Sequence, residues 1–202
     1  MRTAFLLTAL AAVLSAQGAP GLDPAFFTRD PKAIMVACAD KARAAQPRDS
    51  RMLAEFGRIY LAAGQRDRAL DAFKRAEDLG RADAGTHALI ARAWLHHGDK
   101  AAALASAKRM ADLAPKTKTL LARAGVDFMK AGYAEDAAAF MERAYKVDNT
   151  DWRMTLDFGQ AALKAGLPEA AAHWFRRTLT GRTDEEQVWK AVGLAYAEAA
   201  PS

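Results

Sequence analysis

The sequence has little of several residue types that would point to particular kinds of protein. Cys38 is the only cysteine among 202 residues, so no disulfide can form within the chain. There are only seven prolines, and β-branched residues are few, which favours helix. Neither sign of charge dominates, since 29 lysines and arginines accompany 24 aspartates and glutamates. The net charge of +5 gives a mild preference for acidic partners, but charges that alternate in sign do not by themselves indicate nucleic-acid binding.

Long apolar runs are also absent, except near the N-terminus. Arg2 precedes a nearly unbroken apolar segment over residues 4–14, and small residues follow it. This layout predicts a signal peptide over residues 1–18, cleaved near Gly18, with cleavage after Ala16 as the second choice. The run is shorter than the roughly 20 residues of a spanning helix, and an uncleaved leader that anchors the chain to a membrane is the alternative. The sequence therefore predicts an exported bacterial protein, periplasmic or secreted.

Residues that could carry out catalysis or bind metals are scattered. His96 and His97 are adjacent, so on a helix their side chains would point about 100° apart. No serine lies in a G-x-S-x-G setting, and no glycine-rich phosphate loop follows a strand. Many aspartates lie four residues from a lysine or arginine, as Asp71 does from Arg75, and this spacing is typical of a solvated helix face. We therefore expect no catalytic site, no metal site, no cofactor and no enzymatic activity.

Cys38 itself lies in a segment whose apolar residues recur at helical spacing. Ile34, Met35 and Ala42 share this pattern. We expect Cys38 to be a small buried side chain, and the alternative is a reactive thiol or a disulfide between chains.

A period of 34 residues runs through the rest of the chain. One series is all glycine, and others in the same register are small, mostly aromatic, all alanine, or mostly large. The all-glycine series is Gly64, Gly98, Gly132 and Gly166, and the small series is Gly57, Ala91, Gly125, Gly159 and Gly193. The mostly aromatic series is Tyr60, Trp94, Phe128, Ala162 and Tyr196. The all-alanine series is Ala69, Ala103, Ala137 and Ala171, and the mostly large series is Phe73, Ala107, Met141 and Phe175. Glycine ends a helix in the left-handed conformation without steric penalty, and small residues let two helices approach closely. The period therefore predicts a repeated pair of helices.

This pattern resembles the tetratricopeptide repeat, whose unit is two antiparallel helices with a W-x2-L-G-x2-Y … A-x3-F … P layout. Phe56-Gly57-x2-Tyr60 and Ala69-x3-Phe73 carry the resemblance in the first unit. It implies an all-α fold, an α-solenoid that winds as a right-handed superhelix. In this register the sequence predicts a leader over 19–29, a half repeat over 30–49, full repeats over 50–83, 84–117, 118–151 and 152–185, and a capping helix over 186–199.

The resemblance also implies a binding surface. In tetratricopeptide arrays the first helices of successive units line a concave groove in which partner peptides lie. Carried onto this sequence, that geometry predicts an apolar stripe with flanking polar residues: Leu61, Leu95, Met129 and Leu163, with Arg58, Arg92, His96, Lys130 and Lys164. The partner would be a protein or peptide with aliphatic anchors and acidic flanks. The alternative is that the stripe belongs to the core and the charges to an ordinary solvated surface.

Two classes of function are consistent with these features. The first is an exported scaffold or adaptor that holds a protein or peptide in its groove, with cell-envelope assembly or secretion as its setting by analogy alone. The second is a protein that binds nucleic acid or an anionic envelope polymer through its basic surplus. Such binding would fall steeply with salt and would tolerate loss of the apolar stripe.

Overall fold

The computed structural model describes residues 24–45, 48–79 and 82–200. The predicted signal peptide and its cleavage site lie outside these ranges. A short 3-10 helix and ten α-helices follow one another through the described residues: η1 (Pro24–Thr28), α2 (Pro31–Ala45), α3 (Ser50–Ala62), α4 (Arg66–Asp78), α5 (Ala84–His97), α6 (Lys100–Leu113), α7 (Lys118–Lys130), α8 (Ala134–Val147), α9 (Trp152–Lys164), α10 (Pro168–Leu179) and α11 (Glu186–Ala199). The all-α fold predicted from the sequence is thereby confirmed.

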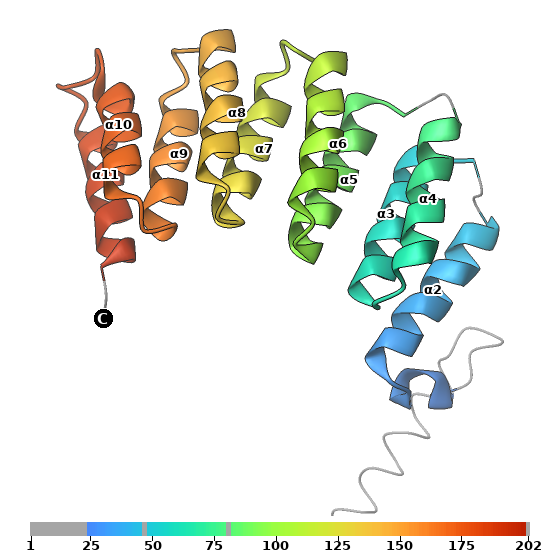
Figure 1. The fold of residues 1–202 in the computed structure, drawn as a ribbon. Coiled ribbons are helices and arrows are strands. Elements are labelled where there is room, and N and C mark those ends of the chain that lie inside the picture. Colours follow the sequence, from blue (N-terminus) through green and yellow to red (C-terminus); the bar gives the residue numbers. More distant parts are fainter. Residues whose placement is uncertain (1–23, 46–47, 80–81, 201–202) are drawn as a thin grey trace, which may run out of the picture.

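The helices pack as successive hairpins that form two layers. The pairs in contact are α3 with α4, α5 with α6, α7 with α8, and α9 with α10. The first helices also contact one another in the order α3, α5, α7, α9 and α11, so they form a continuous layer. Figure 1 shows the hairpins following one another along an arc, with α4, α6, α8 and α10 in the other layer. Neighbouring first helices contact one another more closely than neighbouring second helices do, so the layer of first helices lies on the inner side of the arc.

Glycine and aspartate define many of the helix ends. The four glycines of the all-glycine series have φ values of 80°, 82°, 83° and 72°, the left-handed conformation that ends a helix. Asp49, Asp83 and Asp151 precede α3, α5 and α9, and each accepts a hydrogen bond from a backbone N–H in the first turn. These caps fix where the hairpins turn, and therefore which residues of each first helix reach the inner surface.

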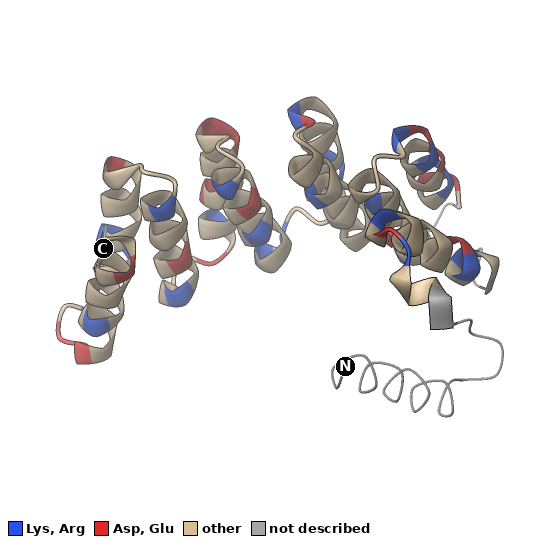
Figure 2. Ribbon diagram, turned by 90° about the horizontal axis from the view of Figure 1, so that it is seen from below, with Lys and Arg blue, Asp and Glu red and all other residues tan. Residues whose placement is uncertain are grey.

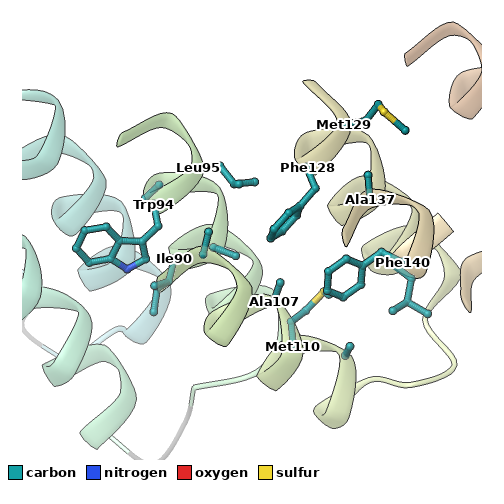
Figure 3. Packing of buried hydrophobic residues seen from close by; sticks show 14 of the residues in the cluster. Ile90, Trp94, Leu95, Ala107, Met110, Phe128, Met129, Ala137 and Phe140 are labelled. Atoms are coloured by element: carbon teal, nitrogen blue, oxygen red, sulfur yellow. The ribbon is translucent and has the colours of Figure 1, made fainter. Parts of the chain in front are cut away.

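The core lies between the two layers and between neighbouring hairpins. Phe128 of α7 and Tyr60 of α3 are fully buried, and Trp94 in the same 34-residue series is buried as well. Figure 3 shows Phe128 among Leu95 of α5, Met110 of α6 and Phe140 of α8, so one side chain joins two consecutive units. At Gly159, an added Cβ would overlap the ring of Phe175 in the opposite helix, which explains why the position holds a glycine.

Cys38 is exposed, so the prediction that it is buried was wrong. The segment is helical as expected, but over residues 31–44 Ala39 is the one buried residue, with an exposed fraction of 1%. The reason is tertiary. In the described residues α2 packs against η1 and α3 and has no first helix of its own unit, so the face that carries Cys38 and Ala42 has no partner helix.

Candidate binding groove

A hollow of about 730 Å³ opens between the first helices of the second, third and fourth units. Its lining comes mainly from α7 and α9, and Arg92 of α5 closes one end. The volume lies within the range of small-molecule and peptide-sized pockets. The hollow occupies the layer of first helices, which is where the tetratricopeptide resemblance places a groove.

The floor of this groove is apolar. Met154, Phe158 and Ala161 of α9 contribute to it and are buried, while Ala122 and Val126 of α7 are partly buried. These residues recur at helical spacings of three and four, so each helix presents one apolar edge to the groove. An aliphatic or aromatic side chain of a ligand would find a nonpolar surface here.

The rim carries more basic than acidic residues. Six lysines and arginines line the hollow, along with three aspartates: Arg92, Lys118, Arg123, Lys130, Arg153 and Lys164, with Asp127, Asp151 and Asp157. The groove is therefore positively charged and suits an acidic ligand.

Part of this charge is already engaged within the protein. The Nη2 atom of Arg92 lies 2.7 Å from a carboxylate oxygen of Asp127. The Nζ atom of Lys118 donates to Asp148 at 2.5 Å and to Asp151 at 2.8 Å. These pairs join neighbouring helices and hold the walls of the groove in position.

Two basic groups on α7 are available to a ligand. Arg123 and Lys130 are exposed, and neither forms an ion pair with another residue in the part of the chain that the structure describes. They are seven residues apart, which is two helical turns, so they lie on the same side of α7. Lys164 of α9 lies 3.8 Å from Glu198, a distance that leaves it able to turn toward the groove.

Asp157 is the acidic group of the groove that has no basic partner at ion-pair distance among the described residues. Its side chain is partly open to solvent, yet the walls of the groove remove some of its water. This partial desolvation raises the pKa of the Asp157 carboxyl, and the negative charge of Asp151 raises it further, while Lys130 lowers it. An acidic ligand would be repelled by the ionised form of this side chain.

The structure brings together three of the nine predicted groove residues. Arg92, Lys130 and Lys164 line the hollow. Arg58 does not, since it lies on α3 and donates to Glu55 at 2.7 Å. His96 is exposed on α5 but lies outside the lining.

The predicted apolar stripe lies in the core. Leu61, Leu95 and Met129 are buried in the hydrophobic cluster, and Leu163 is partly buried against it. Their burial agrees with the alternative that the sequence left open, in which the stripe belongs to the core. The physical reason is that the residue after each member of the Tyr60 series faces the next first helix, which covers it.

Several groove residues were missed by the sequence prediction. Arg123 and Asp157 occupy the same place in consecutive units, 34 residues apart, and Met154 and Phe158 form the floor. The signal that could have found Arg123 and Asp157 was the helical spacing from Lys130 and from Lys164, because a residue seven positions earlier lies on the same face of a helix. That spacing does not reach Met154 and Phe158.

The charges outside the groove are of both signs. Figure 2 shows lysine and arginine interspersed with aspartate and glutamate along the helices. Over the described residues, no group of three or more histidine, cysteine, aspartate or glutamate side chains could hold a metal ion. None of the helices in the same ranges combines the length and the apolar character that crossing a membrane requires.

Comparisons with known proteins bear on the fold. No protein-family model matches the sequence, and no curated protein matches it. A crystal structure of MamA is similar to this chain at 19% identity and a TM-score of 0.50, covering 77% of this chain and 93% of MamA. A second MamA structure gives 18% identity and a TM-score of 0.50, covering 77% of this chain and 85% of that one.

A third structure, that of YrrB, is more distant. YrrB is described as a TPR protein with an unusual peptide-binding site, and it is 15% identical, with a TM-score of 0.46 over 90% of this chain and 87% of YrrB. At these identities the similarities concern the fold and leave the ligand open. The chain is an all-α stack of helices packed as sequential hairpins like those of tetratricopeptide repeats, and it is similar in fold to MamA.

Proposed function

We propose that this chain is an exported scaffold that binds an acidic segment of another protein in the groove formed by α5, α7 and α9. The observation that carries the proposal is the combination of an open, positively charged rim with an apolar floor. An extended or helical peptide could place an aliphatic side chain on the apolar floor beside Val126 and Met154 and its carboxylates near Arg123 and Lys130. The scaffold role makes no use of catalytic groups.

The export part of the proposal rests on the sequence of the N-terminus. A basic residue, an apolar run and small residues follow one another over residues 1–18. Protein isolated from its native host should therefore begin near Ala19. A chain that begins at Met1 would contradict cleavage and favour membrane anchoring. A place in cell-envelope assembly or secretion is part of the same proposal and depends on export.

Charge reversal in the groove tests the binding proposal. We expect Arg123→Glu, Lys130→Glu and Lys164→Glu together to abolish capture of acidic partners from a periplasmic extract. The matched control reverses three exposed bases on second helices, Lys74→Glu, Lys108→Glu and Lys146→Glu, which gives the same net charge. Equal loss of capture in both variants would refute a specific groove.

Salt dependence separates the scaffold from the polyanion-binding alternative. A peptide with apolar anchors should remain partly bound when salt is raised, because burial of its side chains against Val126 and Met154 is not screened by salt. Binding of nucleic acid or an anionic polymer should fall steeply with salt and survive Met154→Ser. Steep salt dependence together with insensitivity to Met154→Ser would replace the scaffold proposal with the polyanion function.

A further inference from the structure

The outer side of α11 exposes large apolar side chains at positions that are buried in every other unit. Trp189 and Tyr196 have exposed fractions of 50% and 46%. In the register of 34 residues, Trp189 corresponds to buried Leu53, His87, Leu121 and Thr155, and Tyr196 to buried Tyr60, Trp94, Phe128 and Ala162. In the earlier units a second helix covers this side, whereas no described helix covers it on α11.

Trp189 and Tyr196 are held in place within the chain. The indole Nε1 of Trp189 donates a hydrogen bond to the backbone carbonyl of Thr183 at 2.9 Å. The rings of Tyr196 and Phe175 lie 5.3 Å apart between centroids. A fixed apolar surface loses little conformational entropy when it docks, which makes it suited to binding a partner helix.

Gly193 lies between these two side chains and marks the missing contact. A Cβ added at Gly125 would lie 2.6 Å from the Cγ atom of Met141, and one at Gly159 would overlap Phe175. No heavy atom lies within 4 Å of a Cβ at Gly193. The close-approach position for a second helix is therefore present on α11, but no described residue fills it.

The other end of the array has the complementary gap. By register α2 is a second helix, and its Met35, Cys38 and Ala42 correspond to Ala69, Ala72 and Ala76, which are buried in α4 beside α3. In α2, Cys38 and Ala42 are exposed and Met35 is partly buried. Among the described residues, no first helix covers this face of α2 and no second helix covers α11.

The two helices also differ in overall charge. Three basic residues and one acidic residue lie on α2, while α11 carries one basic and two acidic residues. Of the α2 charges, Arg43 and Asp40 are already paired with Asp71 and Arg68 of α4. The two helices lie at opposite ends of the arc in Figure 1, so one chain cannot bring them together.

We propose that α11 of one copy of this chain packs against α2 of a second copy, and that the two helices complete one composite hairpin unit. The contact would continue the stacking already made by α9 with α11 and by α2 with α3. Because the two surfaces differ, the contact is head to tail, and it can add further copies as a filament or close as a ring. This assembly is independent of ligand binding in the groove.

Two exposed positions allow a mixing test. Trp189→Glu removes the α11 surface, and Ala42→Glu places a charge on the α2 surface without touching the core. We expect the full chain to form oligomers whose mass rises with concentration in analytical ultracentrifugation, and each variant alone to be a monomer with an unchanged circular dichroism spectrum. An equal mixture should reach twice the monomer mass and stop, because one intact surface of each kind remains.

Other outcomes of the mixing test would overturn the proposal. If Ala42→Glu alone still dimerises, the contact is between two α11 helices. If the full chain is monomeric at all concentrations, these faces are free or are covered by another segment of the same chain.

Crosslinking gives a second measurement that does not depend on the charged variants. The single native cysteine lies on the α2 face, so oxidation of the unchanged chain can give at most a dimer. We expect Ala197→Cys, an exposed position of α11 next to Tyr196 that leaves Gly193 free for close approach, to extend this to a series of trimers and larger species, since each chain then has one thiol at either surface. The control is Ala105→Cys, exposed on α6. Equal series from both variants would show random collision and refute the interface.

Discussion

The fourth unit and the helix that follows it share a sequence pattern but not a burial pattern. Thr155 and Ala162 of α9 are buried, whereas Trp189 and Tyr196, one period later in α11, have exposed fractions of 50% and 46%. Gly159 is covered by Phe175, and Gly193, one period later, is open. The same positions of the repeat therefore have different energetic roles, because burial requires a neighbour. A repeat pattern specifies a surface, and the next helix decides whether that surface becomes core.

The largest expected effect compares Phe128 with Tyr196, which occupy the same position in different units. Phe128→Ala should lower the free energy of unfolding by about 3–5 kcal/mol, because it empties a fully packed site. Tyr196→Ala should cost far less, since nearly half of its side chain is already in water. Urea denaturation of both variants at low protein concentration checks this. Equal losses would show that α11 is as well packed as α7.

A second comparison uses Gly159 and Gly193, which occupy the same position in α9 and α11. Gly159→Ala should destabilise the fold by about 1–3 kcal/mol, because its methyl group would push Phe175 and α10 away. Gly193→Ala should instead stabilise the helix by up to about 1 kcal/mol, since alanine is the better helix former and nothing obstructs it. Thermal unfolding of the two variants measures the opposite signs. A loss at Gly193 would indicate that another helix already covers that position in solution.

The smallest effect concerns the inner face, where α9 shares a groove with α7. Its Asp157 has a raised pKa in the folded state, chiefly from desolvation, so the fold favours the protonated form. The stabilising contribution of this group is present below its unfolded pKa and is lost as pH rises through its folded pKa. Asp157→Asn should therefore stabilise the protein slightly at neutral pH, and this gain should vanish in acid.

Asp127 provides the matched control for Asp157. It lies in the same groove but is paired with Arg92 at 2.7 Å, so Asp127→Asn should remove a favourable contact and lower stability a little at neutral pH. Denaturation midpoints measured across the acidic range distinguish the two. The same sign for both variants would show that the groove does not desolvate Asp157.

Prediction from sequence succeeded where the signal was local and periodic. Gly64, Gly98, Gly132 and Gly166 located the turns, because a left-handed residue is needed wherever a helix stops and reverses. Three of the predicted groove residues, Arg92, Lys130 and Lys164, line the hollow between the first helices, and their role in binding stays a prediction. The sequence left open whether the apolar stripe faces the groove or the core, because two adjacent residues on a helix differ by about 100° in direction, and only the neighbouring helix decides which of them is covered.

The sequence by itself determined the helices, their pairing into hairpins and the spacing of the units, since these depend on contacts within about 34 residues. The tertiary structure alone decided which surfaces remain open. It buried Leu61, Leu95 and Met129 beneath the next unit, exposed Cys38 on α2, and brought Arg123 and Asp157 into one groove. Burial is a property of neighbouring helices, and at the two ends of the array the described residues supply no such neighbour.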